Sequence, residues 1–154
     1  MTDTNAASDV YQGACFCGAI RFELRGEPLV SGHCHCQDCR DWGGTPFIDF
    51  ILVPWDALRI VTGEEHLKLY ARVAETPRGS CALCGSALGA FRKDATPPHV
   101  GMSPHRFADF PFSPTMHVFC EEAVRIWSDN LPHYRTLPQE LGGDGELMPD
   151  PGMS

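Results

Sequence analysis

Short segments in which apolar and polar residues alternate dominate the hydrophobic pattern of the chain. Between residues 14 and 25, Ile20, Phe22 and Leu24 alternate with charged side chains, which is the period-two pattern of a half-buried strand. Apolar and β-branched residues between turn signals predict further strands at residues 29–36, 46–53, 58–62, 66–73, 78–91 (two strands around a turn), 99–102 and 116–120. One helical turn is predicted, over residues 38–44. The pattern therefore favours an all-β or β-dominated fold.

Composition indicates a single folded domain. The 154 residues include 13 prolines and 15 glycines, which leave little room for long helices. Hydrophobic residues make up 43% and charged residues 21%, close to the globular average, which excludes wholesale disorder and coiled-coil or collagen-like structure. We expect residues 1–9 to form a flexible leader and residues 10–136 the domain. The proline- and glycine-rich residues 137–154 are predicted to form a mobile tail.

Charge and the first residues narrow the possible partners. Twelve Lys and Arg against 20 Asp and Glu give a formal net charge of -8, which would repel a phosphate backbone. The first ten residues contain two aspartates, no cation and no apolar run, so they do not resemble a secretory signal. No apolar stretch is long enough to span a bilayer. We expect a cytoplasmic protein that binds neither nucleic acid nor membrane.

Two close cysteine pairs predict a structural metal site. Of the 8 cysteines, Cys15 with Cys17 and Cys81 with Cys84 supply four thiolates, which is the ligand set of a closed tetrahedral zinc site. A glycine follows each pair and allows a tight turn of the backbone. Structural disulfides are the alternative, but they need an oxidising compartment and would close small, strained rings. A thioredoxin-like role for Cys81 and Cys84 would need a surrounding βαβ pattern, which is not visible.

A third cluster, Cys34, Cys36 and Cys39, has no second pair to complete a quartet. Three thiolates leave one coordination position of a zinc ion open to water or substrate, as in a catalytic site. Alternatively, a fourth protein ligand closes the shell. The candidates are His33, His35, Asp38 and Cys120. In an extended segment alternate residues face the same way, so His33 and His35 are expected to point away from Cys34 and Cys36.

These motifs, in this order, resemble one known family. The segments are Gly-Ala-Cys-Phe-Cys-Gly at residues 13–18, Cys-His-Cys-Gln-Asp-Cys-Arg at 34–40 and Cys-Ala-Leu-Cys-Gly at 81–85, followed by His117, Trp127 and Asp-Asn-Leu-Pro at 129–132. The chain resembles the family of glutathione-dependent formaldehyde-activating enzymes and centromere protein V. The resemblance implies zinc-stapled antiparallel sheets similar to the fold of a small zinc-binding chaperone of Rab GTPases. It also implies two zinc ions per chain. Because open, thiolate-rich sites are easily oxidised or stripped, we expect that the second zinc can be partly lost.

The resemblance implies a carbon–sulfur lyase that interconverts S-hydroxymethylglutathione with glutathione and formaldehyde. The cysteines at 15, 17, 81 and 84 would hold the structural zinc, and those at 34, 36 and 39 the catalytic zinc. Two other residues are candidate catalytic groups: Arg40 to offset the excess negative charge of three thiolates, and His35 to move the hydroxyl proton. His117 is predicted to be a hydrogen-bonded sheet residue, and Cys120 a small buried hydrophobe. The alternative function is a non-catalytic zinc domain that binds a protein or small ligand.

Overall fold

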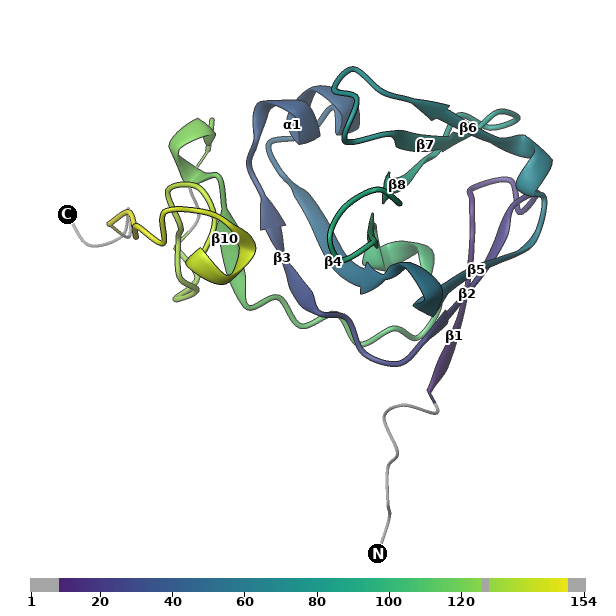
Figure 1. Ribbon diagram of the computed structural model, residues 1–154, viewed down its shortest axis with the longest axis horizontal. Helices are drawn as coiled ribbons and strands as arrows, with labels where there is room; N and C mark the ends of the chain where they lie inside the picture. Colours follow the sequence, from purple (N-terminus) through teal and green to yellow (C-terminus); the bar gives the residue numbers. More distant parts are fainter. Residues whose placement is uncertain (1–8, 126–127, 150–154) are drawn as a thin grey trace, which may run out of the picture. The chain divides into compact units, whose positions relative to one another are not determined.

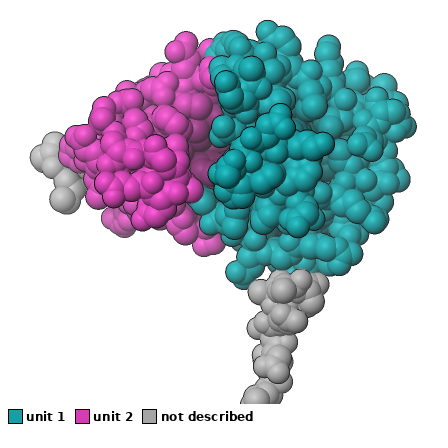
Figure 2. All heavy atoms as spheres, in the orientation of Figure 1, with its two compact units in different colours: residues 1–30, 51–112 teal, residues 31–50, 113–154 magenta. Residues whose placement is uncertain are grey.

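The computed structural model describes residues 9–125 and 128–149. Trp127, residues 1–8 of the predicted leader and residues 150–154 of the predicted tail lie outside the described residues. The chain divides into two compact units (Figure 2): unit 1 consists of Met1–Val30 and Ile51–Phe112, and unit 2 of Ser31–Phe50 and Ser113–Ser154. Each unit therefore joins two stretches of chain that are distant in sequence.

Unit 1 is built from antiparallel strands (Figure 1). One sheet has the order β1-β2-β5, with β1 at Val10–Ala14, β2 at Arg21–Arg25 and β5 at Leu58–Thr62. The other strands of the unit follow in the order β4-β9-β8-β7-β6, where only the residues of β4 from Ile51 onward belong to the unit. Their bounds are β4 Ile48–Pro54, β6 Leu67–Tyr70, β7 Arg78–Cys81, β8 Ala87–Arg92 and β9 His99–Met102.

Alternation places the apolar side chains of these strands in one core. In β2, Phe22 and Leu24 are fully buried while the flanking arginines are exposed, as the sequence pattern predicts. Ile51 and Val53 of β4 are fully buried in the same core. Gly63, after β5, has a φ of 81°, and a Cβ there would overlap the backbone oxygen of Ala19. This close approach requires glycine.

Unit 2 is organised around β3 (Val30–Cys34) and the single α-helix among the described residues, α1 (Gln37–Gly43). In sheet order β3 lies between β10 (Met116–Val118) and β4, whose first three residues belong to this unit. β10 runs parallel to β3 and pairs His117 with His33 and Val118 with Cys34. The sheet that contains β4 and β10 is therefore mixed, with this parallel pair beside antiparallel ones. The resemblance led us to expect antiparallel sheets, and that expectation was wrong for β10.

Short 3-10 turns connect many of these elements, at η2 Trp55–Ala57, η3 Glu64–His66, η4 Pro104–Arg106, η5 Cys120–Glu122 and η6 Gln139–Leu141. Residues 137–149 carry the last of these turns. Their carboxylates Asp144 and Glu146 pair with Arg135, which also pairs with Glu121. The mobility of the segment from residue 137 onward stays a prediction.

The β-dominated fold predicted from the pattern is confirmed. The helical turn expected at residues 38–44 is α1, and the strand expected at residues 58–62 is β5. Strand β1 was not predicted, because its sequence, VYQGA, shows little alternation and contains a glycine. Among the described residues, no helix is both long and apolar enough to cross a bilayer.

Candidate metal centres

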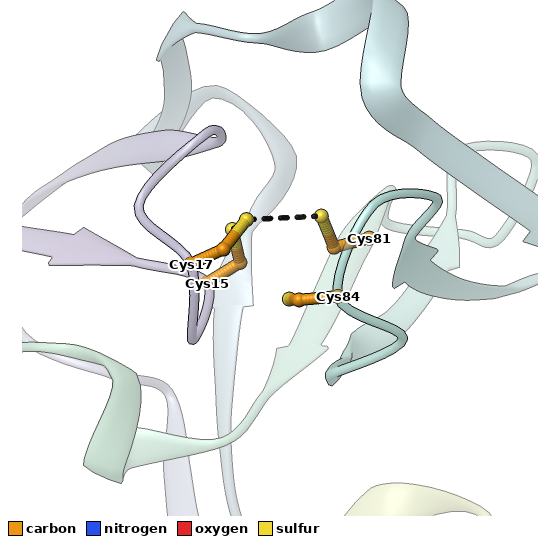
Figure 3. Close-up of side chains that lie close together, drawn as sticks. All are labelled: Cys15, Cys17, Cys81 and Cys84. Atoms are coloured by element: carbon orange, nitrogen blue, oxygen red, sulfur yellow. Dashed lines mark hydrogen bonds between the residues drawn. The ribbon is translucent and has the colours of Figure 1, made fainter.

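Two similar turns bring four cysteines together in unit 1. After β1, Gly18 donates its backbone N–H to the oxygen of Cys15, with a φ of 79°. After β7, Gly85 donates to the oxygen of Cys81, with a φ of 76°. The predicted role of these glycines in tight turns is thereby confirmed. As Figure 3 shows, the side chains at positions 15, 17, 81 and 84 converge from the two turns.

The sulfur positions fit a tetrahedral zinc ion. The Sγ atoms of Cys15 and Cys17 lie 3.6 Å apart, and those of Cys17 and Cys81 lie 3.9 Å apart. Zinc–sulfur bonds of about 2.3 Å in tetrahedral geometry separate the sulfurs by about 3.8 Å. All eight cysteines are free thiols in the structure, which therefore contains none of the structural disulfides considered as an alternative. We therefore infer that this four-cysteine site suits zinc in both donor type and spacing.

Hydrogen bonds favour the thiolate form of Cys15 and Cys84 at this site. The backbone N–H of Ile20 donates to the Sγ of Cys15 over 3.3 Å. The side chain of Ser86 lies 3.2 Å from the Sγ of Cys84, and its hydrogen bond, together with that of the Ser86 backbone, lowers the pKa of Cys84 to about 5. Donors aimed at sulfur are typical of thiolates that ligate metals.

The three-cysteine site lies where β3 passes into α1. Cys34 ends β3, Cys36 caps the helix, and Cys39 lies in its first turn. The Sγ of Cys36 accepts the backbone N–H of Cys39 over 3.3 Å, so the cap that starts the helix also orients two of the sulfurs. The three Sγ atoms lie within 4.8 Å of one another.

No fourth Cys, His, Asp or Glu ligand atom joins this group among residues 9–125 and 128–149. All four candidates weighed from the sequence, His33, His35, Asp38 and Cys120, therefore lie outside it. Cys120 is buried, as predicted, and burial raises its pKa to about 11. The neighbouring sulfurs of Cys36 and Cys39, followed by burial, raise the pKa of Cys34 well above its usual range. A bound dication would relieve this repulsion, so the donor set fits a thiophilic metal ion.

The histidines around Cys34 face the other way, as alternation predicts. The Nε2 of His35 lies 2.8 Å from the Nδ1 of His117, and the ring of His33 lies 4.7 Å from that of His117. The Nδ1 of His35 is the one buried side-chain nitrogen or oxygen without a hydrogen-bond partner among the described residues. Burial, followed by the positive charge that neighbouring histidines carry when protonated, lowers the pKa of His35 to about 4. His35 is therefore a neutral imidazole at physiological pH.

This histidine cluster was missed by sequence reasoning. The Nε2 of His117 lies 2.7 Å from a carboxylate oxygen of Asp129, and the Nδ1 of His33 lies 2.6 Å from one of Asp49. The ring of His133 stacks on His117 at 4.3 Å. His117 is buried and hydrogen-bonded in β10, as predicted, but no spacing rule links it to Asp49, Asp129 or His133.

Arg40, the other candidate catalytic residue, lies in α1. Its Nε donates to the backbone oxygen of His35 over 3.1 Å. This hydrogen bond holds the Arg40 side chain beside the segment that carries the three cysteines. The structure does not bring the ring of His35 into the group of three sulfurs.

Comparison with known proteins identifies the family. Residues 10–122 match the family described as glutathione-dependent formaldehyde-activating enzyme. The chain belongs to this family. Among curated proteins, an uncharacterized lyase of the fission yeast Schizosaccharomyces pombe is 32% identical over 78 residues, which are 51% of this chain and 55% of that protein. The chain thus matches only about half the length of this relative.

A solved structure has a fold similar to that of this chain. The crystal structure of a Rhodobacter sphaeroides protein matches 64% of this chain and 88% of its own with a TM-score of 0.53 and 26% identity. The description of the family and the name of the yeast relative are both those of enzymes.

Proposed function

We propose that this protein is a zinc-dependent carbon–sulfur lyase acting on glutathione-type thiol adducts. In the proposed reaction it interconverts S-hydroxymethylglutathione with glutathione and formaldehyde. The observation that carries the proposal is the group formed by Cys34, Cys36 and Cys39, which has no fourth protein ligand among the described residues. A purely structural site would have a closed shell, whereas an open position admits a substrate.

Cleavage of the adduct S–CH₂–OH breaks the carbon–sulfur bond, and the bonding electrons go to sulfur. The hydroxyl oxygen forms the carbonyl of formaldehyde and releases its proton. A zinc ion at the three-cysteine site would supply a position that holds the sulfur as a thiolate. The reverse reaction adds the thiolate to formaldehyde and returns a proton to the oxygen.

We propose that His35 moves the hydroxyl proton at its Nδ1. Two features support this role: the Nδ1 has no hydrogen-bond partner in the described part of the chain, and the ring is neutral at physiological pH. We propose that Arg40 offsets the net negative charge of three thiolates around a dication. Its hydrogen bond to the backbone of His35 keeps the guanidinium close to the cysteine segment.

The test combines metal content with turnover. We expect protein purified under reductant to hold two zinc ions per chain. Cys36→Ala should lose one of them, stay folded, and lose acceleration of the exchange between formaldehyde, glutathione and their adduct, followed by NMR exchange spectroscopy. Cys120→Ala is the matched control, because Cys120 is a cysteine of unit 2 outside both cysteine groups. It should keep both zinc ions and full exchange activity.

Two results would overturn the proposal. The first is a protein with two zinc ions that does not accelerate the exchange. The second is a Cys36→Ala variant with the exchange rate of the wild type. With either result, a non-catalytic zinc domain that binds a ligand becomes the better interpretation.

A further inference from the structure

The alternation of β3 and β10 produces two chemically different faces in unit 2. Because β10 pairs with β3 in parallel, His117 lies opposite His33, and Val118 lies opposite Cys34. Paired residues share a face, and the next pair along the strand takes the other face. The imidazoles of His33 and His117 are thus on the face opposite to the side chain of Cys34. The lyase proposed above uses the thiolates, and of the imidazoles only His35.

We propose that His33, His117 and Asp129 form a third metal site, which takes a divalent first-row transition ion such as Zn²⁺, Co²⁺ or Fe²⁺. Their ligand atoms lie within 4.8 Å of one another. Two imidazole nitrogens and a carboxylate oxygen suit such ions and are a poor match for soft, thiophilic ions. Three protein ligands leave further coordination positions for water or a ligand.

Hydrogen bonds hold each ligand in place. Asp49 can only accept, so the Nδ1 of His33 carries a hydrogen, and this ring would offer its Nε2 to the ion. A carboxylate behind a ligating histidine is the usual support of such sites in metalloproteins. The carboxylate of Asp129 accepts the backbone N–H of Leu131 over 3.1 Å, which fixes its orientation.

A bound ion would replace the hydrogen that lies between the Nε2 of His117 and the carboxylate of Asp129. Without an ion, the Nε2 of His117 donates to Asp129, so its Nδ1 accepts from the Nε2 of His35. With an ion on its Nε2, neutral His117 carries its hydrogen on Nδ1 and donates to His35. His35 then carries its own hydrogen on Nδ1. Both rings keep one hydrogen, and ion binding reverses the direction of their hydrogen bond.

The site is accessible to ions from solvent. The side chain of Asp129 is 35% exposed and that of His33 is 14% exposed, while His117 forms the buried side at 1%. Asp49 and Asp129 add two negative charges to the cluster. A cation would therefore be attracted to the exposed side and held by the buried ring.

The test uses the full chain with both cysteine sites filled with zinc, and Co²⁺ as the probe. We expect one further metal ion per chain, with visible cobalt bands and without the near-ultraviolet band of thiolate-bound cobalt. Asp49→Asn changes a supporting residue and should weaken Co²⁺ binding about 10- to 100-fold. Asp129→Asn and His33→Gln should each weaken Co²⁺ binding at least as much. His66→Gln, a histidine of unit 1, is the control and should bind Co²⁺ as the wild type does.

A second measurement determines which ring nitrogens of His35 and His117 carry a hydrogen. Zn²⁺ added in place of Co²⁺ should move the hydrogens of His35 and His117 from Nε2 to Nδ1, seen in the ¹⁵N spectra of the rings. The proposal is overturned if the wild type binds no third ion at millimolar Co²⁺, if cobalt enters only with the thiolate band, or if folded Asp129→Asn binds Co²⁺ unchanged. None of these results bears on the lyase reaction, which is tested by exchange kinetics.

Discussion

The Sγ atoms of Cys17 and Cys81 lie 3.9 Å apart, although 64 positions separate the two residues in the sequence. One belongs to the turn after β1 and the other to the hairpin of β7 and β8. A metal ion between them would close a long loop of the chain, which would remove much of the freedom of the unfolded state. The stability of unit 1 should therefore depend on this site.

Removal of the four-cysteine site should unfold unit 1. Structural zinc contributes an apparent binding free energy of about 10–16 kcal/mol, which equals or exceeds the whole stability of a typical domain. We expect Cys81→Ala to lose the dispersed amide signals of residues in β1, β2 and β5, observed by NMR. Cys39→Ala, which affects the site in unit 2, should leave those signals in place. Retention of a folded unit 1 in metal-free Cys81→Ala would contradict the structural role.

Glycine at position 63 should be required for stability. An alanine there must adopt a left-handed φ, at about 1–2 kcal/mol, and its Cβ must also displace the backbone of Ala19. We expect Gly63→Ala to lower the free energy of urea unfolding by more than about 2 kcal/mol. Gly26→Ala is the control, because Gly26 has a φ of 80° but open space around its Cβ. Equal losses in the two variants would argue against the steric overlap.

The core of unit 1 should depend strongly on Phe22. This ring is fully buried in β2, so Phe22→Ala should cost about 3–5 kcal/mol of unfolding free energy, measured by chemical denaturation. Phe16 is 86% exposed in the turn between the first two cysteines. Phe16→Ala should change stability by no more than about 0.5 kcal/mol. A large loss in Phe16→Ala would mean that this ring is buried in solution.

His35→Gln tests the proposed proton transfer separately from metal binding. General acid–base catalysis contributes about 10²- to 10⁴-fold, so we expect the adduct exchange rate to fall within that range while both zinc ions remain bound. His99→Gln, a histidine of β9, should keep the wild-type rate. An unchanged rate in His35→Gln would remove this residue from the proposed mechanism and leave the role of the three cysteines intact.

The strands other than β1 and both cysteine groups could be predicted because their signals are local. Alternation in β2 and the paired spacing of Cys15 with Cys17 each lie within a few residues, and so does the cluster from Cys34 to Cys39. Because a structural zinc ion takes four ligands, the two distant cysteine pairs could then be assigned to one site. The open group of three could be predicted for the same reason, because no second pair exists to complete it.

The histidine cluster and the direction of β10 could not be predicted from the sequence. Parallel pairing of β10 with β3 joins residues more than eighty positions apart, and its register depends on packing rather than on a turn. Asp129 meets His117 only because of this pairing and the loop that follows. Asp49 alternates with apolar neighbours, but its contact with His33 depends on how β4 lies beside β3.

The two faces of β3 also limit how this segment can evolve. The thiolates and imidazoles are interleaved at successive positions from His33 to Cys36, so a residue inserted or deleted inside β3, between Val30 and His33, would exchange the two faces relative to β10. Soft sulfur ligands would then point where nitrogen and carboxylate groups gather, and neither cluster would be complete. Changes of length in this part of the chain should therefore survive selection only in steps of two residues, whereas single substitutions can alter one face without changing the other.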